Sequence, residues 1–467
     1  MNNGKRDADF HDSTYDTGDL ERKEIFLGKI ADCDVRYERG SGSNLRSYAL
    51  ASPKVPQPAL YQPDEAEKLM KMGVEERMKV RISEHYNAMV TGGYGMPPSK
   101  PLANLVTARG EEVSDLDGEI DPSNQLSYSP VAGLLHKYEM ALLYVAKTCS
   151  AHCRYCYRSD LFTGISGKQL AKSQEVRDYI MRHNEAVLEN EGCHPESGHP
   201  ELREVLLSGG DPMVLSNKKL ATWLVDLAEA GIRRIRIGTK ELAFFPERFD
   251  DAFFSMIDYF HQYYPDVRLT FSVHFTHPDE FLLRDSEGSY IDNEASGYVW
   301  LSMVDNAVVR LNKRRHFITL ENQTPIIRDV NDDAEILRTL QRELYAHGIG
   351  NHYFFQCRLI RGFKAFAIPV EETFQIFAES KKGLSGIEAH SRLVMSTEQG
   401  KVEIIGVSGE KGQTDEGMIV FRLLRSPATA ESLGHIIMAR RNSKAFWVDD
   451  YKDRVIEQTE GFMIESH

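Results

Sequence analysis

The chain has 467 residues, of which 41% are hydrophobic and 27% charged, a composition typical of a soluble globular protein. This length is too great for one small core, and it predicts one large α/β domain with additions, or two to three domains. The formal net charge of −14 argues against non-specific nucleic-acid binding, because such binding needs clustered Lys and Arg to displace counterions from phosphate.

The beginning of the chain, Met1 to Asp19, is polar and has no apolar core that could act as a signal peptide. No run of about 18 apolar residues occurs, so we expect neither a membrane span nor a membrane partner. Six cysteines are too few for a disulfide framework in a chain of this length. Together these features predict a cytoplasmic protein, where reduced thiolates are available as metal ligands.

Four segments are predicted along the chain. Residues 1–20 are expected to be a flexible tail, 21–130 a helical N-terminal extension, 131–367 a series of strand–helix repeats, and 368–467 a C-terminal hairpin and helical region. The hairpin is predicted at 392–407, around the turn 398–401, and a charged helical tail from about Ala430. A polar, Gly- and Ser-bearing loop is expected at 285–300.

Short β-rich runs alternate with helical stretches through the third segment. The runs are 141–146, 203–207, 232–237, 268–274, 316–320 and 351–357, with helical spacing at, for example, 220–230 and 334–346. This alternation predicts parallel strands joined by right-handed crossovers. The predicted fold class is therefore α/β, with a partial (βα)6 TIM-like barrel whose chemistry gathers at the C-terminal ends of the strands.

Three cysteines directly follow the first of these strands, in the spacing C-x₃-C-x₂-C. They are Cys149, Cys153 and Cys156. This spacing favours a [4Fe–4S] cluster with three thiolate ligands and one ligand-free iron, which can chelate the amino and carboxylate groups of S-adenosylmethionine (SAM). Electron transfer from such a cluster to the sulfonium releases a 5′-deoxyadenosyl radical.

Two alternatives for the cysteines are a structural zinc site with His152 as fourth ligand and three unrelated buried cysteines. Structural zinc sites usually pair two short clips separated by a dozen or more residues, which this loop lacks. The close clustering argues against unrelated cysteines. A third possibility, from another functional class, is a protein that only binds or senses metal with this loop.

A glycine motif stands at the end of the second predicted strand, in the order Ser208, Gly209, Gly210, Asp211. Two glycines let the backbone approach a ligand closely, and Asp211 is a candidate acceptor for the SAM amino group. Polar groups also follow later strands: Thr239 and Lys240, His274 to His277, and Asn322 with Gln323. Buried polar groups at strand ends need partners, so these bind SAM or substrate or form a structural network.

Several runs, taken together, resemble the lysine 2,3-aminomutase family of radical SAM enzymes. They are 129–138 (SPVAGLLHKY), the cysteine loop, 207–212, 236–238, 274–278 and 322–323, which occur in the family's order within about residues 60–425. The resemblance implies a radical SAM partial barrel and a SAM site formed by Tyr155, Ser208, Gly209, Gly210, Asp211, His274 and Gln323. It also implies that Arg158, two residues beyond the third cysteine, binds the substrate carboxylate.

One departure from the family pattern concerns the substrate side chain. Arg358 stands where the lysine enzymes have an Asp that grips the substrate ammonium. A cation there would repel lysine, so Arg358 is predicted to hold an anionic or acceptor-rich group, and lysine is not expected to be the substrate.

A second departure concerns pyridoxal phosphate (PLP), which the family uses together with SAM. The family's Gly-rich loop with its PLP lysine is missing, and Met140 occupies the region of one basic residue near the PLP phosphate, although Lys137 keeps the other. The first candidate for a PLP lysine is Lys401, ahead of Lys364, and the alternative for Lys401 is an exposed hairpin residue. The family's Cys-rich C-terminal zinc element is also absent.

The leading hypothesis is a radical SAM enzyme that abstracts hydrogen from an amino acid or related carboxylate without PLP, with rearrangement, epimerisation, elimination or dehydrogenation as outcomes. The alternative is a PLP-dependent 2,3-aminomutase acting on an amino acid other than lysine. Expected partners are this small-molecule substrate and a reductant such as flavodoxin or ferredoxin. An open sheet edge also favours association into a homo-oligomer.

Overall fold

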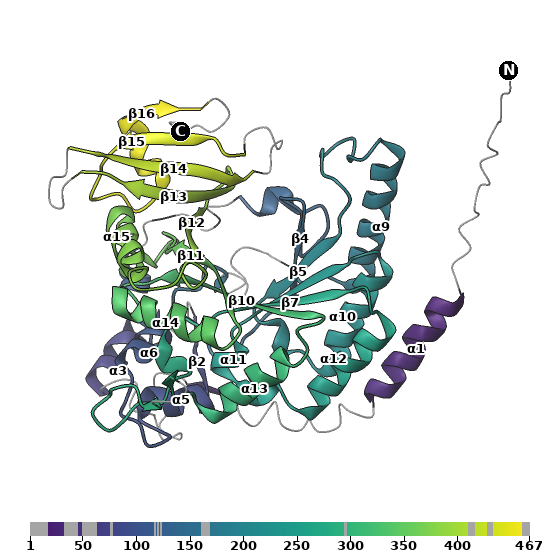
Figure 1. Ribbon diagram of the computed structural model, residues 1–467, viewed down its shortest axis with the longest axis horizontal. Coiled ribbons are helices and arrows are strands. Elements are labelled where there is room, and N and C mark those ends of the chain that lie inside the picture. Colours follow the sequence, from purple (N-terminus) through teal and green to yellow (C-terminus); the bar gives the residue numbers. More distant parts are fainter. Residues whose placement is uncertain are drawn as a thin grey trace.

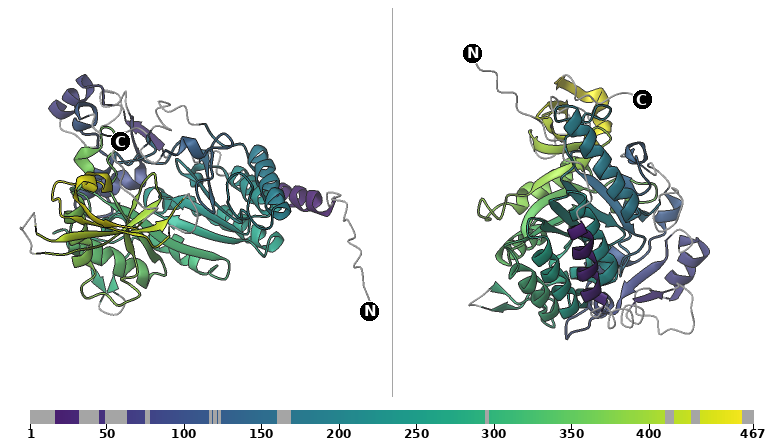
Figure 2. Two further views of the ribbon diagram at one scale, coloured as in Figure 1. Left: turned by 90° about the horizontal axis from the view of Figure 1, so that it is seen from above. Right: turned by 90° about the vertical axis from the view of Figure 1, so that its right-hand side faces the viewer.

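The computed structural model describes residues 17–31, 45–48, 63–74, 78–115, 118, 121, 124–159, 169–293, 297–409, 416–426 and 433–459. Most of the predicted flexible tail lies outside these residues. Residues 17–20 do not fit that prediction, because they form the first turn of helix α1 (Thr17–Ala31). This helix packs on the outer helices α10 and α12, where Phe26 and Ile30 are fully buried (Figures 1 and 2). Burial of this apolar stripe stabilises a helix that its polar sequence alone would not specify.

A large mixed sheet organises the described part of the chain. Its strand order is β16-β15-β14-β13-β12-β11-β10-β7-β6-β5-β4-β3. The six predicted strands are consecutive parallel neighbours at its centre: β4 (Ala141–Ala146), β5 (Glu204–Gly209), β6 (Arg234–Thr239), β7 (Arg268–Val273), β10 (Ile318–Ile326) and β11 (Gly350–Gln356). The predicted α/β class with a parallel sheet is therefore confirmed. The curvature of a partial barrel stays a prediction.

Helices connect the parallel strands and line one side of the sheet (Figure 1). They are α9 (Ser173–Glu189), α10 (Asn217–Glu229), α11 (Glu241–Phe244), α12 (Asp251–Tyr263), α13 (Ser302–Asn312), α14 (Ala334–Ala346) and α15 (Val370–Ser380). The side chains of Ile235 and Ile237 on β6 are buried in the core, whereas Arg236 between them is only half-buried. Because strand side chains alternate, the second face of the sheet is free to carry polar groups.

The N-terminal extension forms a separate layer that covers the cysteine loop. Its elements are β1 (Leu45–Tyr48), α3 (Pro63–Lys71), β2 (Val80–Ser83), α5 (Glu84–Thr91), α6 (Lys100–Val106), α7 (Glu111–Ser114) and the 3₁₀ turn η2 (Leu126–Tyr128). The next strand, β3 (Leu134–Leu135), is an edge strand of the large sheet and pairs with β4. The predicted helical character is thus confirmed in part, with a short β1–β2 pair added. Short turns η3 (Pro212–Val214), η4 (Pro246–Arg248), η5 (Pro278–Glu280) and η6 (Lys364–Phe366) follow strands or helices of the central segment.

The predicted loop at 285–300 contains a small antiparallel pair, β8 (Asp292–Asn293) with β9 (Gly297–Tyr298), and lies between β7 and β10 as expected. No described helix combines the length and the apolar character that a bilayer crossing requires.

The C-terminal region extends the central sheet with antiparallel strands. They are β12 (Arg392–Ser396), which is parallel to β11, and then β13 (Lys401–Val407), β14 (Met418–Arg425), β15 (Ile436–Arg440) and β16 (Val455–Gln458). The predicted hairpin is confirmed as β12–β13. The predicted helical tail is wrong: its described part forms β15, the 3₁₀ helix η8 (Val448–Arg454) and β16. Ile437 and Ala439 are buried at alternate positions, and this period of two suits pairing with β14.

Four imidazole rings stack beside α9, outside the strand ends. The ring centroid of His136 is 4.5 Å from that of His199 and 4.8 Å from that of His183, which in turn lies 4.8 Å from His194. Burial, and next the neighbouring imidazoles, lower the pKa of His136 to about 3, and burial lowers the pKa of His183 and His199. The folded protein therefore holds the rings of His136, His183 and His199 neutral.

Acidification is predicted to loosen this histidine stack. Unfolded histidines bind protons near pH 6.5, whereas His136, His183 and His199 in the folded protein do not, so the stabilisation is present above about pH 6.5 and is lost as the pH falls below it. Hydrogen exchange in residues 183–203, corrected for the intrinsic effect of pH, should speed up between pH 7.5 and 5.5. Helix α10 contains no histidine and serves as the internal reference. Equal changes in both segments would contradict the prediction.

Candidate active site

The three predicted cluster ligands lie in one loop directly after β4. Cys149, Cys153 and Cys156 are half-buried and carry free thiols. Burial, followed by the nearby Asp211, raises the pKa of Cys149 well above its usual value, and burial raises the pKa of Cys153 to about 12. Such thiols stay protonated at neutral pH unless a metal replaces the proton, so this donor set fits a metal cluster better than a free thiolate nucleophile.

No three His, Cys, Asp or Glu side chains in the described part of the chain are placed to hold a single metal ion. A cubane cluster binds its cysteines through different irons, so its ligands need not meet at one point. The ring Nδ1 of His152, the fourth ligand in the zinc alternative, lies 3.0 Å from the carbonyl oxygen of Lys79. We therefore take the loop as a candidate site for an iron–sulfur cluster, with His152 facing the N-terminal layer.

The N-terminal layer holds the cysteine loop from outside through a buried ion pair. Arg154 Nε and Nη2 donate to the two carboxylate oxygens of Glu112 at 3.0 and 2.5 Å, and both side chains are 1% exposed or less. Arg154 Nη1 also donates to the carbonyl oxygen of Met78 at 2.8 Å, and its backbone N–H donates to that of Leu105 at 2.9 Å. Removing one partner of such a pair costs about 3–5 kcal/mol, because the other charge stays buried.

A second pair of contacts lies on either side of Cys149. The guanidinium of Arg81, on β2, donates to the hydroxyl of Thr148, and the backbone N–H of Ser150 donates to Glu241 Oε1 at 2.9 Å. The other carboxylate oxygen of Glu241 and the Nε of Arg81 are buried without a hydrogen-bond partner. Unsatisfied buried polar atoms are rare, so this side of the loop offers both a donor and an acceptor to a bound group.

The glycine motif packs directly against the start of the cysteine loop. Gly210 donates its backbone N–H to the carbonyl oxygen of Ala146 at 2.7 Å, and Asp211 donates its own to that of Thr148 at 2.8 Å. A Cβ on Gly210 would lie 2.3 Å from the Thr148 carbonyl oxygen, and Gly209 has a φ of +110°. Both positions therefore require glycine, one for space and one for conformation.

Asp211 connects the end of β5 to the end of β6. Its carboxylate accepts hydrogen bonds from the backbone N–H of Met213 at 2.9 Å, that of Lys240 at 2.7 Å and the hydroxyl of Thr239 at 3.0 Å. The side chain is 2% exposed, and burial raises its pKa. A carboxylate offers about four acceptor sites. Most of them are used by the protein, and a contact with the SAM amino group stays a prediction.

Other predicted residues meet in pairs across the strand ends. The guanidinium of Arg158 donates to the hydroxyl of Ser208. The hydroxyl of Tyr155 lies 2.8 Å from Nε2 of His274, which burial keeps neutral by lowering its pKa. On β10, Gln323 is half-buried, at the strand position next to the buried Asn322. The structure thus gathers the residues predicted for the cluster, SAM and the substrate carboxylate at one edge of the sheet.

Three cations converge on the end of β12, and we call Lys137, Arg358 and Lys401 the cation group. Arg358 donates to the carbonyl oxygen of Ser396, Lys401 to the Ser396 hydroxyl, and Lys137 Nζ to the Thr397 carbonyl oxygen at 3.3 Å. Lys401 is half-buried, so the alternative of an exposed hairpin residue is wrong. Its sequence neighbours gave no sign of this, because the cations come from three separate elements.

The electrostatic effect of the cation group is strongest on Lys401. Burial, followed by the positive charges of Arg358, Arg425, Arg236 and Lys137, lowers the pKa of Lys401 to about 7. Burial and Arg358 likewise lower the pKa of Lys137 to about 8. A lysine with such a pKa is partly uncharged at neutral pH and can act as a nucleophile, and the whole group attracts anions.

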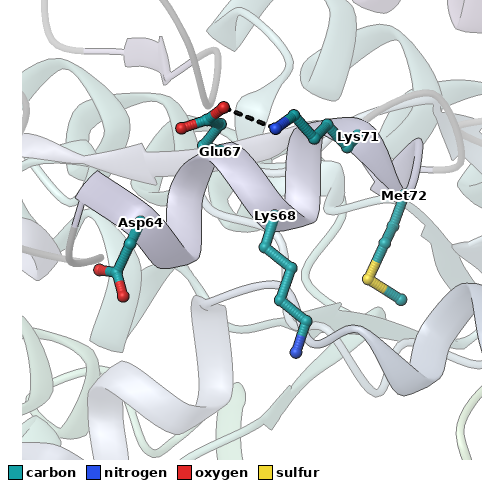
Figure 3. Close-up of a pocket in the computed structure, with 5 residues that line it drawn as sticks. All are labelled: Asp64, Glu67, Lys68, Lys71 and Met72. Atoms are coloured by element: carbon teal, nitrogen blue, oxygen red, sulfur yellow. Dashed lines mark ion pairs between the residues drawn. The ribbon is translucent and has the colours of Figure 1, made fainter.

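A surface pocket beside α3 lies apart from these residues (Figure 3). It is lined by Asp64, Glu67, Lys68, Lys71 and Met72, with an ion pair of 2.6 Å between Glu67 and Lys71. The four charged side chains are exposed, and none of the predicted site residues lines the pocket. We assign no function to it.

One comparison with a known protein extends over most of the chain. It is 35% identical over 389 residues to a putative L-lysine 2,3-aminomutase of Aquifex aeolicus, covering 82% of this chain and 90% of the relative. The chain belongs to the lysine 2,3-aminomutase family. The L-lysine 2,3-aminomutase of Haemophilus influenzae is 28% identical, over 62% of this chain and 74% of the relative. The glutamate 2,3-aminomutase of Clostridioides difficile is 26% identical, over 64% of this chain and 62% of the relative. No protein-family model matches the chain.

Membership of the lysine 2,3-aminomutase family supports a radical SAM, aminomutase-like role for the chain. The sequence analysis missed Arg81, Glu112 and Glu241, which support the cysteine loop in this family member. Arg154 offered a signal, because a charged residue between two ligand cysteines needs a partner if it is buried. Its partner Glu112 could not be found from the sequence, since it lies 42 residues away in a different segment of the chain.

Replacing Gly210 with Ala should displace the cysteine loop. The added methyl group would overlap the Thr148 backbone at 2.3–2.6 Å, and this backbone leads directly into Cys149. Gly238→Ala is the matched control, because a Cβ there meets its neighbours at ordinary distances of 3.5–3.6 Å. After anaerobic reconstitution, G210A should bind less than about half of the wild-type iron, and G238A an amount close to wild type. Equal iron contents would show that the loop tolerates the displacement.

Proposed function

We propose that the chain reductively cleaves SAM at a [4Fe–4S] cluster bound by Cys149, Cys153 and Cys156, and abstracts hydrogen from an amino acid. When bound, the cluster supplies the electron, and its ligand-free iron supplies the attachment point for SAM. The observation that carries the proposal is the contact between the cysteine loop and the glycine turn after β5. Tyr155, His274 and Ser208 lie beside this contact and bind neighbouring side chains there.

The residues of the chain divide this task between them. Tyr155, in the cysteine loop, and His274 hold each other in place through a hydrogen bond. A nucleoside would pack beside their rings. The guanidinium of Arg158 stands beside Ser208 and suits bidentate binding of the substrate carboxylate. Such positioning matters, because hydrogen abstraction requires the reacting atoms to be held in contact. We further infer that the parallel strands curve into a partial barrel, which would bring these groups around one opening.

The cation group favours a substrate with a second anionic group. A lysine ammonium placed about 4 Å from a cation near the protein surface would be destabilised by about 4 kcal/mol for each such neighbour. A carboxylate at the same place would gain a comparable attraction from Arg358, Lys137 and the protonated form of Lys401. One relative is named glutamate 2,3-aminomutase, which agrees with a substrate of this charge type. We therefore propose an amino dicarboxylate, or an amino acid with a similarly acidic side group.

The proposed reaction proceeds without PLP, since the chain lacks the Gly-rich loop that holds the PLP lysine in the family. One observation favours the second candidate, a PLP-dependent 2,3-aminomutase acting on an amino acid other than lysine. The low pKa of Lys401 suits covalent attachment to a carbonyl, and the surrounding cations suit a phosphate. Under this candidate Lys401 would hold PLP, and Lys137 and Arg358 would neutralise its phosphate.

Reconstituted protein with dithionite and SAM should release 5′-deoxyadenosine. The release should be at least about tenfold greater with glutamate than with lysine, because the cation group attracts a carboxylate and repels an ammonium group. Cys153→Ala should abolish release, whereas Cys193→Ala is the matched control, because Cys193 is exposed and lies outside the site. A wild-type protein that carries a cluster yet never cleaves SAM would refute the proposed function. Faster release with lysine would refute only the substrate class.

The two candidates make opposite predictions about whether the purified protein carries a pyridoxal chromophore. The PLP-free reaction predicts no absorbance near 400 nm (about the usual position for protein-bound PLP) after expression with pyridoxine, and no borohydride-fixed label. The PLP-dependent candidate predicts a label on the peptide that contains Lys401, which Lys401→Met removes and Lys364→Met leaves in place. Activity that requires added PLP would decide for the second candidate.

A further inference from the structure

Lys240, the residue that follows β6, is the centre of a buried polar network. Its side chain is 7% exposed. The ammonium group donates to Glu280 Oε1 at 2.7 Å, the carbonyl oxygen of His274 at 2.8 Å and the hydroxyl of Thr276 at 2.9 Å. These three acceptors use all three donors of an ammonium group. Lys240 therefore binds the residues that follow β7 in one fixed arrangement.

The network reaches the cysteine loop on one side and the N-terminal layer on the other. The Tyr155 hydroxyl lies 2.8 Å from Nε2 of His274 and 3.3 Å from the hydroxyl of Thr276, both in the turn that Lys240 holds. Glu280 accepts a hydrogen bond from the hydroxyl of Tyr86, on α5, at 2.9 Å. Both oxygens of the fully buried Glu280 are thus engaged, since Oε2 accepts the backbone N–H of Thr276 at 2.6 Å.

The ion pair of this network lies one hydroxyl group away from the cysteine loop. The Lys240 ammonium donates to the hydroxyl of Thr276, which lies 3.3 Å from the hydroxyl of Tyr155, a residue of the loop between Cys153 and Cys156. Glu280 accepts the backbone N–H of the same Thr276. Both charges are therefore buried beside the loop, in a region from which water is largely excluded.

Relying on the proposed cluster, we propose that Lys240 and Glu280 are positioning residues that set the reduction potential of that cluster. Reduction adds a negative charge, which a nearby cation stabilises and a nearby anion destabilises; charge and hydrogen bonding around the sulfurs are known to shift such potentials. Lys240 would raise the potential, and Glu280 would lower it. By fixing His274 and Thr276, the same pair would hold the Tyr155 ring in place for SAM.

The test is a redox titration of the full-length, reconstituted protein, followed by the electron paramagnetic resonance signal of the reduced cluster. Lys240→Met should decrease the ratio of reduced to oxidised cluster at a fixed potential by about tenfold, equivalent to about 59 mV for a one-electron couple. Glu280→Gln should increase this ratio, because it removes the negative charge while the single amide oxygen can still accept the hydrogen bonds from Lys240 and Tyr86. The double variant K240M/E280Q should fall between the two single variants.

Opposite shifts of the reduction potential in the two single variants distinguish an electrostatic role from a merely structural one. A loss of packing would shift the potential of both variants in the same direction. Lys219→Met removes an exposed charge on α10 and should leave the potential unchanged. Shifts of the same sign, or no shift in E280Q, would overturn the proposal. If K240M binds no iron, the comparison of E280Q with the wild-type protein and K219M still tests the predicted shift.

Failure of this inference is distinguishable from failure of the proposed function. A wild-type protein that binds a cluster and cleaves SAM, but whose potential does not respond to either charge, would overturn only the role of Lys240 and Glu280. A wild-type protein that forms no such cluster would overturn the proposed function, and the role of the pair with it.

Discussion

The contact between the glycine turn after β5 and the backbone that enters the cysteine loop is the constraint on which the rest of the site depends. Gly210 and Asp211 donate their backbone N–H groups to the carbonyl oxygens of Ala146 and Thr148, and the approach leaves no space for a Cβ. Two neighbouring parallel strands thereby fix the first ligand cysteine relative to the glycine turn. From this point the loop can only continue outward, toward the N-terminal layer that covers it.

Buried charges add to the apolar packing of the cysteine loop. The Arg154–Glu112 pair and the Lys240–Glu280 pair are both almost fully buried, and each connects the loop or its neighbours to a different part of the chain. Replacing such pairs with apolar groups often maintains stability, so stability alone is a weak reason for their presence. A defined geometry, and a defined field next to the proposed cluster, are features that apolar residues could not supply.

The cation group gives this member of the lysine 2,3-aminomutase family its individual character. Lys137, Arg358 and Lys401 approach one another at the end of β12 despite their repulsion. Burial first, and then the neighbouring positive charges, lower the pKa of Lys401, which reflects the unfavourable energy of charging it there. An anionic ligand would relieve this repulsion. The same feature therefore argues for an acidic substrate group or a phosphate, and against the ammonium side chain of lysine.

The sequence by itself determined the six parallel strands, the three cysteines, the glycine turn and the family resemblance, because each depends on local spacing or on a short motif. The resemblance also implied roles for Arg158, Ser208, Tyr155 and His274, and the structure places these residues at or just beyond the ends of neighbouring parallel strands. Only the tertiary structure decided which polar groups are partners, for example Arg154 with Glu112, and that Lys401 lies among other cations. Such contacts join residues far apart in the chain, and their energies depend on burial and on distance in space, which no local pattern encodes. The C-terminal strands β15 and β16 have the same origin, because the pairing of β15 with β14 and of β16 with β15 overrode the helical character predicted for this charged region.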